Sequence, residues 1–235
     1  MKVRIKFAKQ GVMKFIGHLD VMRYFQKAMR RANIDIAFSE GFSPHMIMSF
    51  AAPLGVGLTS DGEYLDIELR TPISSEQALK QLNAVMVEGM QVLSFRQVPD
   101  GKVGNAMALV AAADYTLRFR DDAGFAEGWQ SKLADFYAQP CIHVIKKTKK
   151  SEVETDIRPM IYDLHAQGDT VHMTLATGSA ANLKPELVMD AFAAYLGEEL
   201  GEFVLLINRN EVYADAGKEG ARYLVSLESL GEDIL

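Results

Sequence analysis

Near the N-terminus a histidine directly precedes a helical pattern, in the segment Gly17-His18-Leu19-Asp20. At the start of a helix the backbone N–H groups are unpaired and the helix dipole is positive, so an anion is favoured there. His18 is therefore a candidate to bind a phosphate, or to act as general acid or base on a phosphodiester. A structural alternative stays open, in which Gly17 or His18 caps the helix and Asp20 supplies a favourable charge in the first turn.

A second histidine ends the loop Ser39-Glu40-Gly41-Phe42-Ser43-Pro44-His45. Gly41 gives the backbone freedom and Pro44 stiffens it. Phe42 and His45, on either side of Ser43, carry rings that can stack on the bases of single-stranded RNA. Alternatively, Phe42 packs into the core and Pro44 only stiffens a hairpin. We expect the start of the helix and this loop to converge into one electropositive hollow.

Metal binding is the weakest of the chemistries that these residues suggest. His18 and His45 are potential ligands together with Asp20 or Glu63, but a His-x-Asp spacing is not specific for a metal site. Cys141 is the single cysteine of the chain, which excludes an internal disulfide and a thiolate-held cluster. We expect Cys141 to be a small core residue, and we predict neither a metal nor a cofactor.

Basic residues are concentrated in the first part of the chain. Residues 1–31 carry nine Lys and Arg side chains against one Asp, a net charge of +8, whereas the whole chain has −6. Arg23, Lys27 and Arg30 recur at i, i+4 and i+7 and so share one helix face, with Arg31 beside them. A second basic run, residues 146–150, includes Lys147. These side chains either contact phosphates or form an ordinary solvated surface.

Periodicity predicts the elements that position these residues. Residues 2–8 alternate as a half-buried strand with its Lys and Arg side chains on the outer face, and residues 18–32 form an amphipathic helix whose apolar stripe includes Leu19. Asn33 suits a left-handed helix end. Further strands are expected at 34–39, 46–51, 63–70 and 90–98, with a helix that starts after Ser74. The order is β-α-β-β-α-β, the ferredoxin-like arrangement.

The second half repeats this order with one additional strand. A strand at 115–120, a helix at 125–137, a strand at 141–146, a hairpin at 160–176, a helix from Pro185 and a strand at 203–208 are expected. The sequence therefore predicts an α+β protein of tandem ferredoxin-like (βαββαβ) domains with antiparallel sheets. The first domain is 1–98, a linker is 99–113, and the second domain is 114–235 with a C-terminal extension.

Composition places the chain among soluble globular proteins, with 49% hydrophobic and 24% charged residues. No apolar run approaches the ~20 residues that a bilayer span requires, and the N-terminus lacks the apolar core of a signal peptide. We expect a cytoplasmic protein with no membrane contact. The sequence carries no signal for an oligomeric state.

Several of these segments carry a family resemblance. The chain resembles the radical-SAM-associated domain family, a family of unknown function, and the likeness covers most of its length. A departure is Met46-Ile47-Met48, where the family more often has a proline and a lysine after the histidine. The segments that carry the resemblance are Phe15–Asp20, Arg30–Ala32, Ser39–His45, Ser49–Ala51, Pro53-Leu54, Glu63-Tyr64, Ala106–Leu109, Lys146-Lys147, Asp156–Pro159 and Pro185.

The resemblance implies an accessory protein that works with a separate radical SAM enzyme, since members are similar to the C-terminal part of such enzymes or are encoded beside one. We hypothesise a substrate-recognition module that binds RNA. Two alternatives stay open. One is a metal-independent endoribonuclease with His18 as acid/base, suggested by a fold-level likeness to CRISPR repeat-processing enzymes. The other is a protein-docking module. The expected binding residues are His18, Asp20, Arg23, Lys27, Arg30, Arg31, Gly41, Phe42, Ser43, His45, Glu63 and Lys147.

Overall fold

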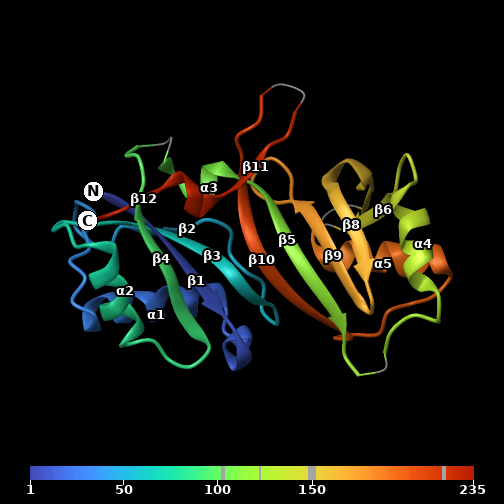
Figure 1. The fold of residues 1–235 in the computed structure, drawn as a ribbon, viewed down its shortest axis with the longest axis horizontal. Helices are drawn as coiled ribbons and strands as arrows, with labels where there is room; N and C mark the ends of the chain where they lie inside the picture. The colour runs from blue at the N-terminus through green and yellow to red at the C-terminus, as the bar shows by residue number, and fades with distance from the viewer. Residues whose placement is uncertain (102–103, 122, 148–151, 219–220) are drawn as a thin grey trace. The chain divides into compact units, whose positions relative to one another are not determined.

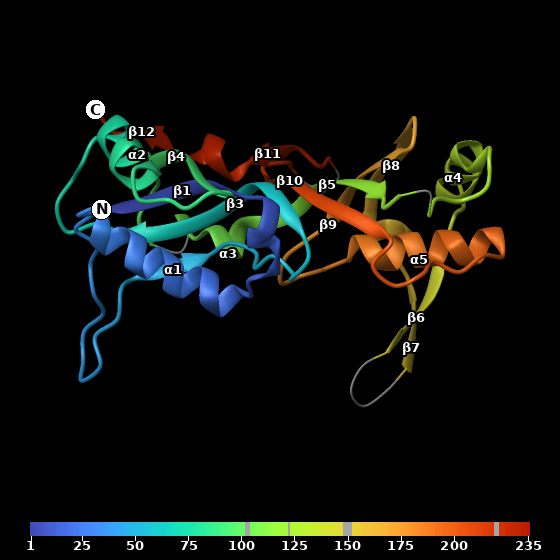
Figure 2. The ribbon, with the colours of Figure 1, turned by 90° about the horizontal axis from the view of Figure 1, so that it is seen from below.

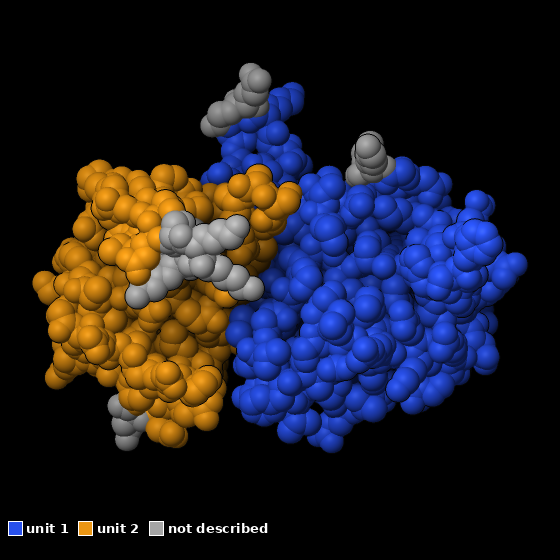
Figure 3. All heavy atoms as spheres, turned by 180° about the vertical axis from the view of Figure 1, so that it is seen from behind, with its two compact units in different colours: residues 1–112, 209–235 blue, residues 113–208 orange. Residues whose placement is uncertain are grey.

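The protein is a mixed α+β chain in which a large, mostly antiparallel sheet carries a few short helices (Figure 1). The computed structural model describes residues 1–101, 104–121, 123–147, 152–218 and 221–235. It divides into two compact units (Figure 3). Unit 1 comprises Met1–Ala112 and Arg209–Leu235, and unit 2 comprises Ala113–Asn208.

Unit 1 has the β-α-β-β-α-β order that the sequence predicts. Its sheet contains the antiparallel neighbours β4-β1-β3, and β2 pairs with the other edge of β3. The strand expected at 34–39 is reduced to two isolated bridges, Ile36 with Leu69 and Phe38 with Met46. The elements are β1 (Lys2–Lys9), η1 (Gly11–Phe15), α1 (His18–Arg31), β2 (Met48–Phe50), β3 (Thr59–Glu68), α2 (Ser75–Asn83) and β4 (Met90–Gln97).

Helix α1 covers one face of this sheet because its apolar stripe meets the apolar face of β1. Phe25 and Met29 of α1 and Ile5 and Phe7 of β1 are all buried in one hydrophobic cluster. The helix ends at Asn33, whose positive φ of 53° lets the N–H of Ile34 return to the carbonyl of Met29 at 3.0 Å. The predicted left-handed helix end is therefore confirmed.

The prediction that residues 209–235 extend the second domain is wrong. They belong to unit 1, where the end of β10 lies beside β3, and β12 pairs with β4. Figure 2 shows α1 on one side of β1 and β3 and the C-terminal segment on the other. The added elements are α3 (Ala106–Leu109), β10 (Leu205–Asp215), β11 (Leu224–Ser226), η4 (Leu227–Leu230) and β12 (Glu232–Asp233).

A buried ion pair explains why the C-terminal segment packs on the sheet of unit 1. Arg4 is 1% exposed, although the strand pattern places it on the outer face. Its Nε donates to Asp66 Oδ1 at 2.8 Å, and its guanidinium also donates to the carbonyls of Leu227 and Gly104. Asp66 in turn accepts the N–H of Ala106 at 2.7 Å. A charged pair on a sheet must be either solvated or enclosed by hydrogen-bonding groups, and here the connector and the C-terminal segment enclose it.

Unit 2 contains the sheet order β10-β5-β9-β8, while β6 and β7 form a separate two-stranded sheet. The predicted hairpin is confirmed as β8 and β9. Rings of Phe125, Trp129 and Phe192 pack between the helices and the sheet. The elements are β5 (Val110–Phe119), α4 (Trp129–Tyr137), β6 (His143–Lys147), β7 (Glu152–Asp156), η3 (Arg158–Met160), β8 (Ile161–Gln167), β9 (Thr170–Ala176), α5 (Pro185–Leu196) and the start of β10.

The segment Asp156-Ile157-Arg158-Pro159 has a structural role in unit 2. Asp156 Oδ1 accepts the N–H groups of Ile142 and Arg158, at 2.8 and 3.0 Å. The guanidinium of Arg158 lies 4.1 Å from the centre of the Tyr137 ring and donates to the Tyr137 carbonyl. These bonds join the end of α4 to the turn before β8.

Within the described residues, no helix combines the length and apolar character needed to cross a bilayer.

Candidate functional site

His18 is the first residue of α1, after Gly17 at the N-cap position. The Gly17 carbonyl accepts the N–H groups of Asp20 and Val21, and no side chain caps the helix. The His18 ring is half-buried and meets the ring of Phe50 edge-to-face, with 5.0 Å between the centres. The His18 ring therefore packs against the apolar core through Phe50.

His18 also lines a small hollow together with Lys9 and Glu63, whose apolar walls include Phe7 and Phe50. The hollow encloses about 10 Å³, which is room for one water molecule and no more. The structure thus brings together His18 and Glu63, two of the expected site residues. The hollow is too small to admit a nucleotide.

Buried charges surround this hollow. The Arg209 guanidinium donates from Nε to Glu63 Oε1 at 2.7 Å, and both residues are about 4% exposed. Lys9 is 2% exposed, and its Nζ donates to the Ile16 carbonyl at 3.0 Å. Burial lowers the pKa of Lys9, and the nearby Arg209 charge lowers it further, although Glu63 acts in the opposite sense. This arrangement holds a charge network in place inside the unit.

A second, partly buried cluster of charges lies on the other face of β1. Lys6 Nζ contacts Glu211 Oε2 at 2.7 Å and Glu228 Oε2 at 3.1 Å, and the Tyr64 hydroxyl donates to Glu211 at 2.6 Å. Burial and the charge of Glu211 raise the pKa of Tyr64. Lys6 is therefore held by two carboxylates with its side chain 17% exposed, and Arg4 and Lys9 are buried. Three of the nine cations counted over residues 1–31 are thus covered or neutralised inside unit 1.

The loop that contains His45 closes on itself. Ser39 Oγ lies 2.8 Å from His45 Nδ1 and accepts the His45 N–H at 3.1 Å, while the Ser39 N–H donates to the His45 carbonyl at 2.8 Å. Gly41 has a φ of +106°, and Phe42 at the tip is fully exposed. The alternative that Phe42 packs into the core is wrong. The His45 ring is held by the loop itself.

His18 and His45 do not converge as we expected. Phe50, which contacts His18, pairs with Leu65 of β3, whereas the base of the loop bridges Leu69 through Ile36. Leu65 and Leu69 are four residues apart along this part of the chain, which is about 13 Å in an extended strand. His45 lies farther away still, beyond the bridge at Leu69. Figure 2 shows the loop leaving the C-terminal end of α1, opposite to the end where His18 begins the helix.

The basic face of α1 is exposed, but its members differ. Arg23 forms an i,i+3 ion pair with Asp20 at 3.2 Å. Lys27, Arg30 and Arg31 are exposed in the last turns of the helix, and Arg31 donates to the Val85 carbonyl at 3.4 Å. The loop with Phe42 therefore leaves the same end of α1 that carries these three cations. The backbone of Lys147 ends β6, but its side chain and residues 148–150 lie outside the described residues.

Apolar side chains are exposed around the start of α1. Val12, Phe15, Leu19 and Val56 are between 60% and 76% exposed. The expectation that Leu19 belongs to the buried stripe of α1 is wrong, because the helix turns Val21, Phe25 and Met29 into the core cluster and leaves Leu19 60% exposed. No group of three or more His, Cys, Asp or Glu residues in the described ranges is placed to hold a metal ion.

The chain matches a family model over residues 2–185, and the family is described as an uncharacterized protein conserved in bacteria (DUF2344). The chain belongs to this family. The predicted membership in a domain family of unknown function is thus confirmed. A comparison with curated proteins finds no match.

Among solved structures, one similar chain occurs in a crystal structure of a Cbf5-Nop10-Gar1 complex, at 10% identity and a TM-score of 0.47. The alignment covers 89% of the present chain and 48% of the other, so the present chain spans about half the length of that relative.

In this family member, the charged residues of the network around the hollow beside His18 could not be found from local sequence patterns. Lys9 is one of many basic residues near the N-terminus, and Arg209 is separated from Glu63 by 146 positions. Cys141 is exposed, not a core residue, because it lies in the turn before β6.

Proposed function

We propose that this protein is an accessory module that binds single-stranded RNA and presents it to a separate radical SAM enzyme in the cytoplasm. Its RNA-binding surface consists of Phe42 and the C-terminal turns of α1, with Lys27, Arg30 and Arg31. Proteins that bind single strands without sequence preference combine a cationic track for phosphates with exposed rings on which bases stack. The fully exposed Phe42 on a loop at the basic end of α1 is the observation that carries the proposal.

The loop is suited to present a ring because its base is tied by hydrogen bonds. Three contacts between Ser39 and His45, together with the bridge from Phe38 to Met46, define the base of the turn that carries Phe42. A ring that is already positioned loses less conformational freedom when a base stacks on it. His45 adds an exposed imidazole beside it, although the Ser39 hydroxyl engages Nδ1.

The radical SAM partner is proposed from the family resemblance and from the cysteine count. A chain with one cysteine cannot supply the three thiolates that hold an iron–sulfur cluster, so radical chemistry would belong to the partner. We further infer that both units are variants of the ferredoxin-like arrangement. The order β4-β1-β3-β2 in unit 1 and β10-β5-β9-β8 in unit 2 supports this, with β6 and β7 as an insertion.

Fluorescence anisotropy with a labelled oligouridine tests the proposal. Phe42→Ala should weaken binding by about 1–3 kcal/mol, the usual contribution of one stacked base. Phe203→Ala is the matched control, because Phe203 is 82% exposed in unit 2 and is not part of the proposed surface. Equal effects of the two substitutions, or no binding by the unmodified protein, would refute the RNA proposal.

A protein-docking module is a second candidate, favoured by the exposed apolar residues Val12, Phe15, Leu19 and Val56. If this surface meets the partner enzyme, Phe15→Asp should abolish a complex that survives nuclease treatment. If the complex instead depends on nucleic acid, nuclease treatment alone should dissolve it.

The endoribonuclease alternative has a direct test. The His18 ring packs on Phe50 and faces a hollow for one water molecule, so we expect no cleavage of RNA in the presence of a chelator. Cleavage that is lost in His18→Ala would establish the enzyme instead.

A further inference from the structure

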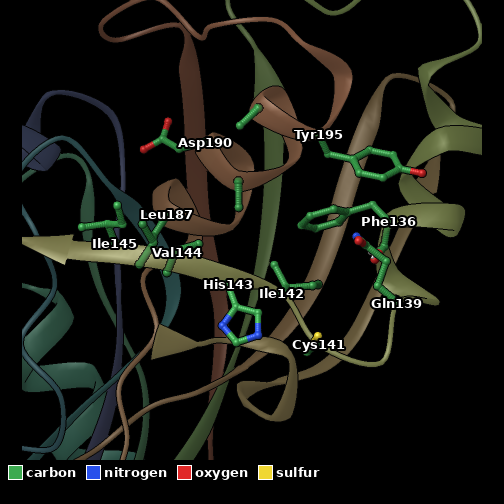
Figure 4. A pocket seen from close by; sticks show the side chains of 12 residues that line it. Phe136, Gln139, Cys141, Ile142, His143, Val144, Ile145, Leu187, Asp190 and Tyr195 are labelled. Atoms are coloured by element: carbon green, nitrogen blue, oxygen red, sulfur yellow. Dashed lines mark hydrogen bonds between the residues drawn. The ribbon is translucent and has the colours of Figure 1, made fainter. Parts of the chain in front are cut away.

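Unit 2 contains a hollow of about 780 Å³ between α5 and β6. Figure 4 shows it with Tyr195 and Phe136 at one end and Leu187 and Ile145 toward the other. We call it the α5–β6 groove, lined by α5, the end of α4 and residues 141–145. Its volume is in the range of sites that bury most of a ligand's surface.

Helix α5 is apolar on two faces. Val188, Met189 and Phe192 are fully buried in the core of the unit. A second stripe, with Leu187, Ala191, Ala194 and Tyr195 at i, i+4, i+7 and i+8, lines the groove. A helix that is apolar on both faces is normally covered on both, yet Tyr195 is 44% exposed. The small side chains of Ala191 and Ala194 leave the space that makes this face concave.

The strand that borders the groove has an unpaired edge. Among the described strands, β6 pairs with β7 alone. The register pairs His143 with Asp156, so Ile142 lies opposite Ile157, and the Ile157 N–H donates to the Ile142 carbonyl at 2.8 Å. The pair Ile142–Ile157 is thus a hydrogen-bonded pair, and along an antiparallel ladder such pairs alternate with non-hydrogen-bonded ones. His143 and Ile145 belong to the non-hydrogen-bonded pairs, so their backbone N–H and C=O groups point away from β7. Both residues line the groove.

One carboxylate lines the groove at its solvent-exposed rim. Asp190 lines the groove on α5, and no side chain that the structure describes forms an ion pair or hydrogen bond with it. Partial burial raises the pKa of Asp190. A cationic group brought into the groove would therefore meet an accessible carboxylate with which to form an ion pair.

We propose that the α5–β6 groove binds an extended peptide segment of a partner protein, which adds as a third strand along β6 and places a lysine or arginine side chain opposite Asp190. In this mode, main-chain hydrogen bonds to a strand edge supply affinity, and pockets for alternate side chains supply specificity. The backbone groups of His143 and Ile145 form the edge, and the second stripe of α5 receives the apolar side chains. The groove is independent of the proposed RNA surface, so either can fail without the other.

Peptides selected from a random phage-displayed library against the full chain provide the probes. We expect alternating apolar residues around a lysine or arginine. A synthetic peptide of that sequence should slow the modification of Cys141 by a thiol reagent, because this single, exposed cysteine lines the groove. Methylating the peptide N–H groups that face β6 should abolish binding, whereas methylating the alternate N–H groups should not.

Matched variants locate the binding. Asp190→Asn should weaken the peptide about threefold to tenfold, and Glu186→Gln, which removes the same charge from the same helix outside the groove, should change it less than about twofold. Ala194→Phe fills the groove and should abolish binding, while Ala134→Phe on the exposed side of α4 should not.

The proposal is overturned if no selected peptide protects Cys141, or if Asp190→Asn and Glu186→Gln have equal effects. It is also overturned if neither methylated series loses affinity, since the groove would then accept side chains or small molecules without strand addition. Circular dichroism establishes that each variant is folded. If Ala194→Phe is not, the Asp190 pair and the methylated peptides decide the outcome.

Discussion

The salt dependence of RNA binding should separate the cations that reach the surface from those that do not. Lys27, Arg30 and Arg31 are exposed at the end of α1, whereas Arg23 is engaged with Asp20 at 3.2 Å. Each phosphate neutralised on a single strand contributes about −0.7 to the slope of log K against log salt, so three cations predict a slope of about −2. Between about 50 and about 200 mM salt, affinity should therefore fall about 18-fold.

Replacing both Arg30 and Arg31 with alanine should leave one of the three contacts. The predicted slope is then about −0.7, and the same change in salt should reduce affinity only about 2.6-fold. Lys132→Ala with Lys184→Ala is the matched control, because it removes two exposed cations from unit 2 and should leave the slope unchanged. Anisotropy titrations with a labelled oligouridine at several salt concentrations measure all three slopes.

The interpretation in which every cation of residues 1–31 faces RNA predicts a different salt slope. If all nine cations of residues 1–31 contacted RNA, the slope would be about −6. A slope near that value would mean that Arg4, Lys6 and Lys9 are not enclosed as the structure describes them. A slope near zero would remove RNA binding, and a slope unchanged in the double variant would place the binding surface elsewhere.

Three further predictions concern stability. Arg4→Met removes the guanidinium from the buried Asp66 carboxylate, which keeps only the Ala106 N–H and the more distant Lys2 Nζ at 3.7 Å, and should cost about 3 kcal/mol. In a chain of this size that lowers the Tm by about 6–12 °C, and a Tm within about 1 °C of the parent would contradict the buried pair. Gly62→Ala places a Cβ 2.6 Å from the Asn210 carbonyl and should cost about 1–3 kcal/mol, whereas Gly55→Ala, with its nearest side-chain atom at 3.7 Å, should not. Burial raises the pKa of Glu228, but Lys6 outweighs it and leaves the pKa lowered, so Glu228 stabilises the fold above the ordinary glutamate range and this contribution is lost on acidification. Denaturant titrations from neutral to acidic pH should show a shallower loss of stability for Glu228→Gln than for the parent.

Features set by short segments could be predicted from the sequence. The helix from His18, its left-handed end at Asn33 and the hairpin of β8 and β9 each depend on residues within a few positions of one another. Periodicity and capping chemistry act over that range, which is why the order of elements in unit 1 was confirmed.

Features that depend on distant partners could not be predicted in this way. Arg4 lies opposite Asp66, 62 positions away, and its guanidinium also reaches the Leu227 carbonyl, 223 positions away. An alternating strand of apolar and basic residues is the pattern of a solvated outer face, and nothing in it signals that a C-terminal segment covers that face. The exposed edge of β6 could not be predicted for the same reason. The order of apolar and polar residues in a strand does not say whether a second neighbour lies beside it.

The charge count of residues 1–31 shows how contacts between distant residues change the functional hypothesis. A net charge of +8 in one segment would attract an anionic partner only if those charges faced solvent together. In the structure the charges divide by element: the cations of β1 neutralise carboxylates from β3, β10 and η4, whereas those at the end of α1 remain exposed. The exposed basic surface is therefore smaller than the sequence implies, and this is why the proposed RNA-binding surface is the one beside Phe42 and not the one beside His18. An RNA that bound at His18 would have to displace the Phe50 contact and open a hollow that holds one water molecule, whereas one that binds at Phe42 requires no change in the fold.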